Sequence, residues 1–188
     1  MKNSVQHIYP VERAGHFESK MRRWVQNPRK IIGPYVKAGM TVLDAGCGPG
    51  FFSIDMARMV GLSGRVIAAD VQDGMLQKLR DKIHNTELEA RITLHQCGAQ
   101  RIGWTGAVDF VLAFYVVHEL PDQDAFFQEV GSLLAPNGRI FVVEPSFRVS
   151  KAVFENTVNQ ARKSGLLPVA APKVFFSKTV LLKRGKEM

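Results

Sequence analysis

The sequence predicts an α/β fold: a doubly wound, mostly parallel seven-stranded sheet with an antiparallel last strand. Short β-branched runs alternate with amphipathic helical windows along most of the chain, which is typical of a parallel sheet covered by helices on both faces. The final two apolar runs, 167–171 and 179–182, are joined by a connection that has no helical window. They must therefore pair as a hairpin, and the last strand runs antiparallel to the others.

Five further runs are expected to form the parallel strands. They cover residues 41–44, 65–70, 91–95, 109–114 and 139–144. The run RVIAAD at 65–70 is continuously apolar between its ends, as in strands that are buried on both faces. Pro136, Asn137 and Gly138 are expected to form a turn before the fifth strand. A longer loop is expected over 96–107.

Helices are expected between these strands, each beginning or ending at a residue suited to that position. The first expected helix covers 51–60 and is ended by Gly61, and the last covers 150–164 and begins at Ser150. Asp73 is expected to cap the second helix, which buries Leu76, Leu79 and Ile83. Asp122 is expected to cap the third, which buries Phe126, Val130, Leu133 and Leu134.

Residues 1–38 precede this alternation and are expected to form a helical lid over a catalytic core at 39–188, all within a single domain. Asn27 and Pro28 fit the N-cap and first turn of a short helix that ends at Gly33-Pro34. An earlier helix is expected from four apolar residues that share one stripe. These are Phe17, Met21, Trp24 and Val25.

Composition excludes several classes of protein. A chain of 188 residues with 46% hydrophobic and 22% charged residues fits one folded domain rather than a disordered chain or a coiled coil. Its longest apolar run, 110–117, is far shorter than the roughly 20 residues of a membrane span. The first ten residues do not resemble a signal peptide, and two cysteines build no disulfide framework, so we expect a cytoplasmic protein.

The formal net charge of +8 permits an anionic partner without identifying one. The basic residues are scattered along the chain, and aromatic residues that could stack on bases are not interleaved with them. The sequence therefore does not favour nucleic acid as a partner. We expect a monomer or a homodimer.

The segment VLDAGCGPG at 42–50 carries the strongest functional signal. A strand enters a turn with glycines at 46, 48 and 50, and the following helix N-terminus can face a negatively charged or polar group. Asp70 ends the next strand, where a carboxylate can accept both hydroxyls of a ribose. These features predict a nucleoside site, with a purely structural strand-to-helix turn as the alternative.

Two details favour S-adenosyl-L-methionine over a dinucleotide as the ligand. The glycine spacing is G-x-G-x-G instead of the dinucleotide pattern G-x-G-x-x-G. Asp44 beside the turn would repel a pyrophosphate, but it could hold the ammonium group of an amino-acid tail.

The chain resembles the class I S-adenosylmethionine-dependent methyltransferases, whose Rossmann-like fold matches the expected topology. VLDAGCGPG is similar to the first motif of that superfamily and RVIAAD to the second. DFVLAFYVVHEL at 109–120 and LLAPNGRIFVVEP at 133–145 resemble its strand-four and strand-five motifs. The resemblance covers about 38–184 and is greatest to the small-molecule branch that includes quinone-biosynthesis C-methyltransferases.

This resemblance implies roles for residues along the site. Gly46, Cys47 and Gly48, in a turn completed by Gly50, would wrap the methionine portion by backbone, with Asp44 behind them. Asp70 would bind the ribose, Val71 would pack on the adenine, and Phe114 would face the methionine end. The adenine loop departs from the family pattern, because Cys97-Gly98-Ala99 stands where an acidic residue is common. The backbone of Gly98 and Ala99 is expected to substitute, or else Gln96 or Gln100 contributes.

Methyl transfer needs alignment of the reacting groups, and a general base only when the acceptor must lose a proton. His118 follows the fourth strand and could be that base, although a structural loop histidine is the alternative. Phe114 and Tyr115 could face the sulfonium or simply pack in the core. Glu144 could bind a cationic substrate or cap a loop.

His16 and Tyr9 could contribute from the lid. Cys47 is expected to be a small turn residue rather than a nucleophile. No metal is expected, because His7, His84 and His95 are not spaced as ligands.

The sequence favours a small-molecule acceptor. It lacks the Asn/Asp-Pro-Pro-aromatic motif of amino-methylating nucleic-acid enzymes, the Pro-Cys of cytosine-C5 enzymes and the several cysteines of arsenite methyltransferases. Three alternatives remain open: an RNA methyltransferase, a nucleotide-dependent oxidoreductase on the same topology, and a module that binds the cofactor without catalysis.

Overall fold

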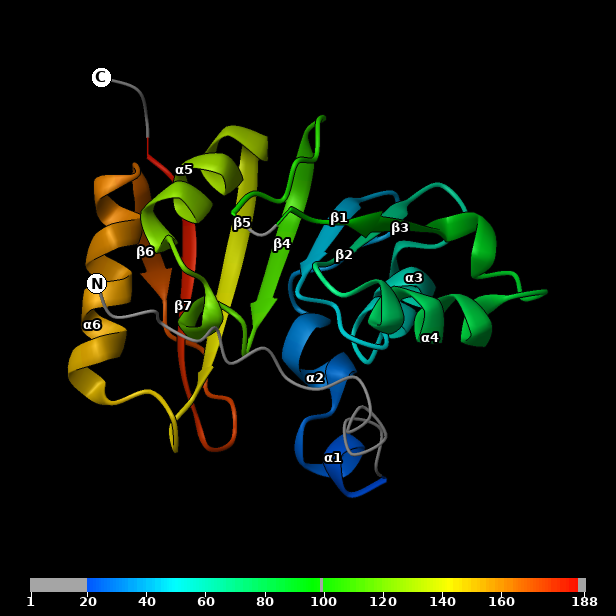
Figure 1. The fold of residues 1–188 in the computed structure, drawn as a ribbon, viewed down its shortest axis with the longest axis horizontal. Coiled ribbons are helices and arrows are strands. Elements are labelled where there is room, and N and C mark those ends of the chain that lie inside the picture. Colours follow the sequence, from blue (N-terminus) through cyan, green and yellow to red (C-terminus); the bar gives the residue numbers. More distant parts are fainter. Residues whose placement is uncertain (1–19, 99, 186–188) are drawn as a thin grey trace.

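The computed structural model describes residues 20–98 and 100–185. Its seven strands form one sheet in the order β3-β2-β1-β4-β5-β7-β6 (Figure 1). The strands are β1 (Thr41–Ala45), β2 (Arg65–Asp70), β3 (Ile92–Gln96), β4 (Val108–Phe114), β5 (Leu134–Pro145), β6 (Leu166–Ala170) and β7 (Ser177–Arg184).

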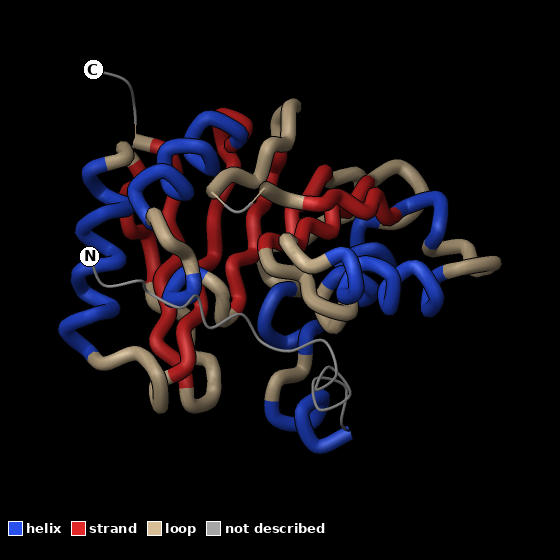
Figure 2. Tube along the Cα trace, viewed as in Figure 1, coloured by secondary structure: helices blue, strands red, loops and turns tan. Residues whose placement is uncertain are grey.

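Helices occupy both faces of this sheet. They are α1 (Lys20–Val25), α2 (Pro28–Ile32), α3 (Ser53–Val60), α4 (Asp73–Ile83), α5 (Gln123–Leu133) and α6 (Lys151–Lys163), together with the 3₁₀ turns η2 (Glu89–Arg91) and η3 (Val117–Glu119). In Figure 2, α3 and α4 lie beside the β1–β3 half of the sheet, and α5 and α6 lie beside the β5–β7 half.

The predicted fold class is confirmed. Strands β1 to β5 pair in parallel, while β7 pairs antiparallel with both β5 and β6. The hairpin of the last two strands is also confirmed, with β7 inserted between β5 and β6. The antiparallel pairing of β7 puts the loop before it at the same edge as the carboxyl ends of β4 and β5.

Side chains of the central strands alternate between two cores. Val42 on β1 packs with α2, α3 and α4 on one face, whereas Leu43 packs with α5 and α6 on the other. Both residues are fully buried, as expected for a strand that is covered on both faces. In the described part of the chain, no helix combines the length and apolarity that crossing a membrane requires.

Several local predictions are confirmed. The Asn27 side chain accepts a hydrogen bond from the Lys30 backbone N–H at the start of α2. Asp122 and Ser150 cap α5 and α6 in the same way, through the N–H groups of Ala125 and Val153. These caps satisfy amide groups that would otherwise lack a partner in the first helical turn.

Three local predictions are wrong in detail. Asp73 is the first residue of α4 and Gln72 takes the N-cap position, although the Asp73 charge still suits the helix N-terminus. The predicted turn at 136–138 lies within β5, because a bulge carries the extra residues between the pairs Val108–Leu134 and Phe110–Arg139. The helix expected from residue 51 begins at Ser53.

The expected apolar stripe of the first helix is also wrong at Trp24, whose side chain is 85% exposed. The six-residue α1 instead contacts the start of α3 through its arginines. Arg23 pairs with Asp55, and the Arg22 guanidinium lies 4.1 Å from the centre of the Phe51 ring. Phe17 lies outside the described residues, as do His7, Tyr9 and His16.

The glycine turn before α3 gives a first testable prediction. Gly50 has a φ of 90°, and a Cβ atom there would lie 2.3 Å from Leu79 Cδ1. Gly50→Ala is therefore expected to lower the free energy of unfolding by about 2–5 kcal/mol, the sum of backbone strain and overpacking. Urea denaturation measures this loss.

Gly48→Ala is the matched control for Gly50→Ala. Gly48 also has a positive φ, 53°, but no heavy atom lies within 4 Å of the Cβ position. Only the backbone strain applies, so we expect a loss of about 1–2 kcal/mol. Equal losses in the two variants would contradict the packing role of Gly50.

Candidate cofactor and acceptor site

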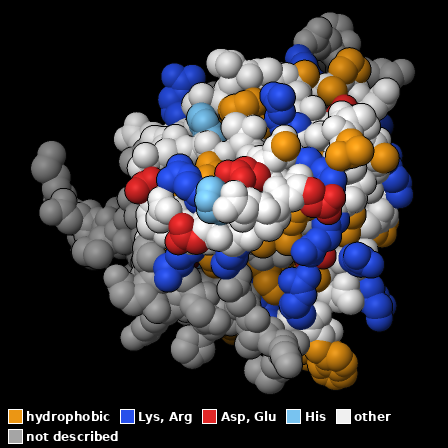
Figure 3. Space-filling model, turned by 90° about the vertical axis from the view of Figure 1, so that its right-hand side faces the viewer, with side chains coloured by type: hydrophobic (Ala, Val, Ile, Leu, Met, Phe, Trp, Pro, Cys, Tyr) orange, Lys and Arg blue, Asp and Glu red, His pale blue; other side chains and the backbone are white. Residues whose placement is uncertain are grey.

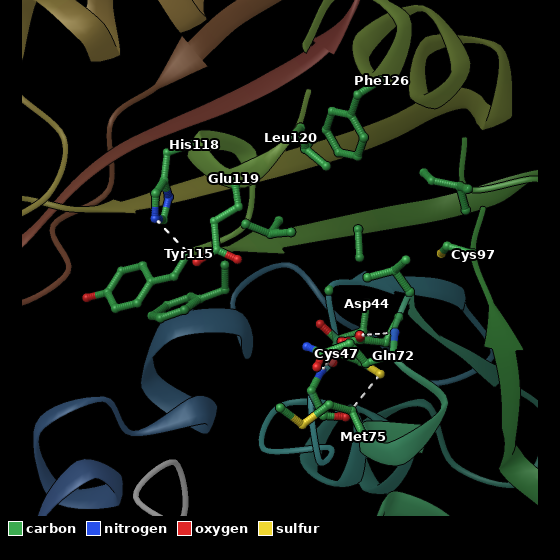
Figure 4. Close-up of a pocket in the computed structure, with 18 of the residues that line it drawn as sticks. Asp44, Cys47, Gln72, Met75, Cys97, Tyr115, His118, Glu119, Leu120 and Phe126 are labelled. Carbon is green, nitrogen blue, oxygen red and sulfur yellow. Dashed lines mark hydrogen bonds and ion pairs between the residues drawn. The ribbon is translucent and has the colours of Figure 1, made fainter. Parts of the chain in front are cut away.

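A cavity of about 350 Å³ opens at the carboxyl ends of β1, β2 and β4. Open α/β sheets bind ligands at this edge, where the strand order reverses. Its wall combines the glycine turn, the end of β2, the loop after β3, the residues after β4 and the β5–α6 loop. Figure 4 shows Asp44, Cys47 and Gln72 on one side of this cavity, with Tyr115, His118 and Glu119 on another.

The glycine turn is held against β2 by its own backbone. The N–H groups of Gly46 and Cys47 donate to the Ala69 carbonyl at 2.8 and 3.0 Å. A Cβ atom at Gly46 would lie 2.6 Å from Val116 Cγ2, so a side chain cannot fit there. At Gly48 the Cβ position is open, and this residue lines the cavity. The turn thus offers bare backbone to a ligand.

Asp70 closes the cavity at the end of β2 and is nearly fully buried. Its Oδ1 accepts from the Gln72 N–H at 2.9 Å, and its Oδ2 accepts from the Gly48 N–H at 2.8 Å. Burial raises the pKa of this carboxyl group, while these backbone donors oppose the rise. Each oxygen keeps acceptor capacity for one more donor, which fits the two hydroxyls of a ribose.

Asp44 lies beneath the glycine turn and also lines the cavity. Burial raises its pKa from 3.8 to about 7, with a smaller rise from Asp70. The Ser53 hydroxyl opposes that rise by donating a hydrogen bond to Asp44 Oδ2 at 2.6 Å. A buried carboxyl poised in this way can become an anion when a cationic group binds beside it.

Asp44→Asn is expected to flatten the pH dependence of stability. With its raised pKa, native Asp44 stays protonated up to about pH 7, whereas the unfolded chain loses this proton near 3.8. The native state binds more protons in that interval, so the free energy of unfolding falls as the pH rises through it. Asn does not titrate and can still accept from Ser53.

Urea denaturation of both proteins at about pH 5 and pH 8 measures this effect. The loss of stability between the two pH values is expected to be smaller in Asp44→Asn than in the native chain. An equal loss in both proteins would show that Asp44 does not carry the raised pKa.

The expected adenine end of the cavity is lined by Val71, Cys97, Gly98 and Gln100. The Cys97 N–H donates to the Asp70 carbonyl at 2.9 Å, which fixes the start of this loop. Gln96 is not part of the wall. Ala99 lies outside the described residues.

Glu129 is a feature of this loop that sequence reasoning missed. Its carboxylate, on α5, accepts hydrogen bonds from the N–H groups of Ile102 and Gly103 at 2.9 and 2.7 Å. His95, at the end of β3, also bonds the Ile102 carbonyl at 2.7 Å. Nothing in the local pattern of α5 signals the contact, because it spans 26 residues of sequence.

The residues after β4 form a polar cluster on the opposite wall. His118 Nδ1 is hydrogen-bonded to Glu144 Oε2, and the backbone N–H of His118 donates to Glu144 Oε1 at 3.3 Å. His118 Nε2 is buried without a hydrogen-bond partner among the described residues. It lies 3.8 Å from Glu119 Oε1, and Figure 4 shows these two side chains facing each other.

The two carboxylates beside His118 differ in surroundings. Glu144, at the end of β5, is almost fully buried behind the histidine and does not line the cavity. Glu119 lines the cavity, 3.7 Å from Arg148 Nη1. Burial raises the pKa of Glu119, while His118 and Arg148 oppose the rise. Glu144 can therefore orient His118, whereas Glu119 can meet a ligand.

Tyr115 joins three separate parts of the chain. Its φ is 61°, a left-handed conformation that is uncommon for residues other than glycine. Its hydroxyl group accepts from Gln26 Nε2 at 2.8 Å and bonds Ser177 Oγ at 2.7 Å. Its ring packs 4.4 Å from that of Phe114, and both residues line the cavity.

The remaining residues that the sequence singled out have packing positions or carry unreactive thiols. Gly50 does not line the cavity, because its open side faces Leu79. Burial raises the pKa of the Cys47 thiol well above its usual value and that of Cys97 to about 12. Neither thiol ionises at neutral pH. Among the described residues, no three His, Cys, Asp or Glu side chains are grouped as a metal site.

This arrangement defines a class of protein. A glycine turn after β1, a buried carboxylate ending β2 and a cavity at the switch point of a seven-stranded sheet are typical of Rossmann-like nucleoside-binding enzymes. The antiparallel β7 and the open Gly48 cradle fit S-adenosylmethionine, the cofactor that the sequence resemblance implied.

Comparison with known families agrees with this class. Residues 36–175 match the family model described as "Methyltransferase domain". The chain belongs to this methyltransferase domain family, and the expected class I S-adenosylmethionine-dependent methyltransferase is confirmed.

Two curated relatives are similar to part of the chain. A demethylmenaquinone methyltransferase from Lactobacillus johnsonii is 35% identical over 112 residues, 59% of this chain and 46% of the relative. A ubiquinone/menaquinone biosynthesis C-methyltransferase from Haemophilus ducreyi is 31% identical over 121 residues, 64% and 45% of the two chains. The chain thus matches about half the length of these relatives.

Two solved structures share the fold. A SAM-dependent methyltransferase from Aquifex aeolicus has a TM-score of 0.82 at 22% identity, covering 93% of this chain and 98% of its own. A TehB-like SAM-dependent methyltransferase from Corynebacterium glutamicum has a TM-score of 0.71 at 16% identity, covering 93% and 100%. These likenesses support the architecture.

Proposed function

We propose that this chain transfers a methyl group from S-adenosylmethionine to a small-molecule acceptor, and that His118 removes a proton from that acceptor. The observation that carries the proposal is His118 Nε2, buried in the wall of the cavity and without a hydrogen-bond partner among the described residues. Glu144 holds the other ring nitrogen, which leaves Nε2 free to accept a proton.

The cofactor would occupy the side of the cavity formed by the glycine turn. Gly46, Cys47 and Gly48 would face its methionine portion, Asp44 its ammonium group and Asp70 its ribose. When bound, S-adenosylmethionine supplies a methyl group on a positively charged sulfur, which is already activated for transfer. The protein therefore needs chiefly to align the acceptor and to exclude water.

The acceptor would lie between the cofactor and the His118 cluster. The cavity wall includes four aromatic side chains, namely Phe52, Phe114, Tyr115 and Phe126. Such a wall suits an apolar ring, and His118 suits a ring that carries an ionisable hydroxyl group. Because both named relatives methylate quinone precursors according to their names, we propose a hydroquinone-like acceptor, methylated on carbon.

The N-terminal residues would cover this site as a lid. In the described part, Arg22 on α1 lines the cavity and Gln26 bonds the Tyr115 hydroxyl. Both contacts support a position of the α1–α2 segment beside the acceptor. We propose the cytoplasm as the location of the protein and a monomer or homodimer as its state.

A transfer assay with tritium-labelled methyl groups tests this function. Short-chain hydroquinones are expected to be labelled, whereas simple amines, thiols and bulk RNA are not. The face visible in Figure 3 favours a small-molecule acceptor over RNA, because its Lys and Arg side chains lie among acidic and apolar side chains instead of forming one basic patch. Labelling of RNA alone would replace the small-molecule proposal.

A further inference from the structure

Three phenylalanine side chains stand exposed at the edge of the sheet that carries the cavity. Phe147, in the β5–α6 loop, is 76% exposed, while Phe175 and Phe176, in the β6–β7 loop, are 59% and 68% exposed. We call these three residues the aromatic rim. Clusters of exposed aromatic side chains typically mark a surface that binds a membrane or another protein.

The two loops of the aromatic rim are fastened to each other. The Ser146 N–H donates to the Phe176 carbonyl at 2.9 Å, and Lys178 Nζ donates to the Val149 carbonyl at 2.7 Å. Figure 1 shows both loops at the lower end of β5 and β7, on the side where α1 and α2 also lie. The two loops of the rim therefore lie side by side at this edge.

The outward position of the rim is built into the backbone. Phe176 has a φ of 50°, a costly conformation for an aromatic residue. The Ser177 N–H bonds the Val174 carbonyl at 3.2 Å, and Val174 packs against the core. The rings of Phe175 and Phe176 stack edge to face at 4.6 Å. The fold thus holds the two rings in solvent.

The aromatic rim continues into the cavity. Phe147 and its neighbour Arg148 line the cavity wall. Ser177, directly after Phe176, bonds the hydroxyl group of Tyr115, which also lines the cavity. A surface that docks on the rim would therefore sit at the entrance to the proposed acceptor site.

Positive charge flanks the rim. Lys151, at the start of α6, and Lys173, in the β6–β7 loop, are exposed, and Arg148 is about half exposed. The carboxylates facing these cations are Glu155, 3.8 Å from Lys151, and Glu119, 3.7 Å from Arg148. With Lys178 included, cations exceed carboxylates around the rim. Aromatic rings set among cations suit the headgroup layer of an anionic bilayer.

We propose that the aromatic rim docks this protein on the surface of an anionic phospholipid bilayer, with the cavity mouth toward the lipid. The phenyl rings enter the headgroup layer, and Arg148, Lys151 and Lys173 meet lipid phosphates. An apolar acceptor dissolved in the bilayer then reaches the site without crossing water. The proposal goes beyond methyl transfer, since docking needs neither cofactor nor acceptor.

Vesicle co-sedimentation of the full chain tests the proposal. Vesicles that contain phosphatidylglycerol are expected to bind the protein, pure phosphatidylcholine vesicles much less, and high salt should weaken the binding. The variant Phe175→Ser/Phe176→Asn is expected to bind at least tenfold more weakly. Asn replaces Phe176 because it tolerates a positive φ.

A charge variant tests the electrostatic part. Lys151→Gln/Lys173→Gln is expected to weaken binding to anionic vesicles about tenfold or more, since each lysine near the membrane contributes about fivefold. Leu62→Ser and Arg65→Gln are the matched controls, because both residues are exposed and lie at the amino end of β2, whereas the rim lies at the carboxyl end of β5. Thermal melting checks that every variant is folded.

Three outcomes would overturn the docking proposal. The first is no binding to anionic vesicles, and the second is equal binding by the native protein and the Phe175→Ser/Phe176→Asn variant. The third is a dimer that depends on the rim and forms when no vesicles are present. The last outcome would assign the rim to a second copy of the chain. None of these results bears on methyl transfer to a water-soluble acceptor, so the failure of docking and the failure of the proposed activity are distinguishable.

Discussion

Replacing His118 by alanine is expected to lower the turnover of methyl transfer about 10²- to 10⁴-fold, the range that a positioned general base contributes. The physical reason is the Nε2 atom of His118, which is buried in the cavity wall without a hydrogen-bond partner among the described residues, while Glu144 holds Nδ1. Cofactor affinity is expected to stay unchanged, because the imidazole lies away from the glycine turn. Single-turnover kinetics and calorimetry measure the two quantities separately.

Two further measurements separate a base from a structural histidine. Added imidazole should restore part of the rate in His118→Ala, which a packing defect would not allow. Glu144→Gln should also lose activity, since an amide can donate to Nδ1 and place the ring proton on Nε2. His84→Ala, at an exposed position after α4, is the matched control. Full turnover in His118→Ala would make this histidine structural.

Asp70→Ala is expected to weaken the binding of S-adenosylmethionine tenfold or more, because a hydrogen bond to a charged group contributes about 1.5–3 kcal/mol. Asp70 also holds the N–H groups of Gly48 and Gln72, so its loss loosens the glycine turn as well. Asp73→Ala, in the first turn of the adjacent α4, is the control and should bind normally.

A double-mutant cycle isolates the ribose contact from the effect on the turn. The native chain should bind 3′-deoxyadenosine more weakly than adenosine, whereas Asp70→Ala should bind the two nucleosides alike. If the missing hydroxyl costs the same affinity in both proteins, Asp70 does not contact it. Unchanged affinity for S-adenosylmethionine in a folded Asp70→Ala variant would equally contradict the role.

The fold was predictable because its signals are local. Apolar runs, capping residues and the hairpin connection each occupy a few neighbouring residues, so β2 and the caps at Asp122 and Ser150 are found where the sequence predicts them. The predictions that are wrong concern segments whose conformation is set by tertiary contacts. The bulge keeps 136–138 within β5, and the contacts of α1 leave Trp24 in solvent.

The site divides in the same way. The glycine turn and Asp70 could be predicted as candidate site residues because a strand, a tight turn and a terminal carboxylate leave a pattern in sequence. The contacts that complete the site leave none. Glu144 lies 26 residues from His118, Glu129 lies 26 residues from Gly103, and Gln26 lies 89 residues from Tyr115.

By itself the sequence determined the order of the strands along the chain, the glycine turn and the class of enzyme, since hydrophobic periodicity and glycine conformation act over short distances. Only the tertiary structure decided that Glu144 is hydrogen-bonded to His118 and that the loops of Phe147 and of Phe175 and Phe176 lie side by side. Strand register sets these contacts, because it brings the end of β4 beside the end of β5 and the start of β7.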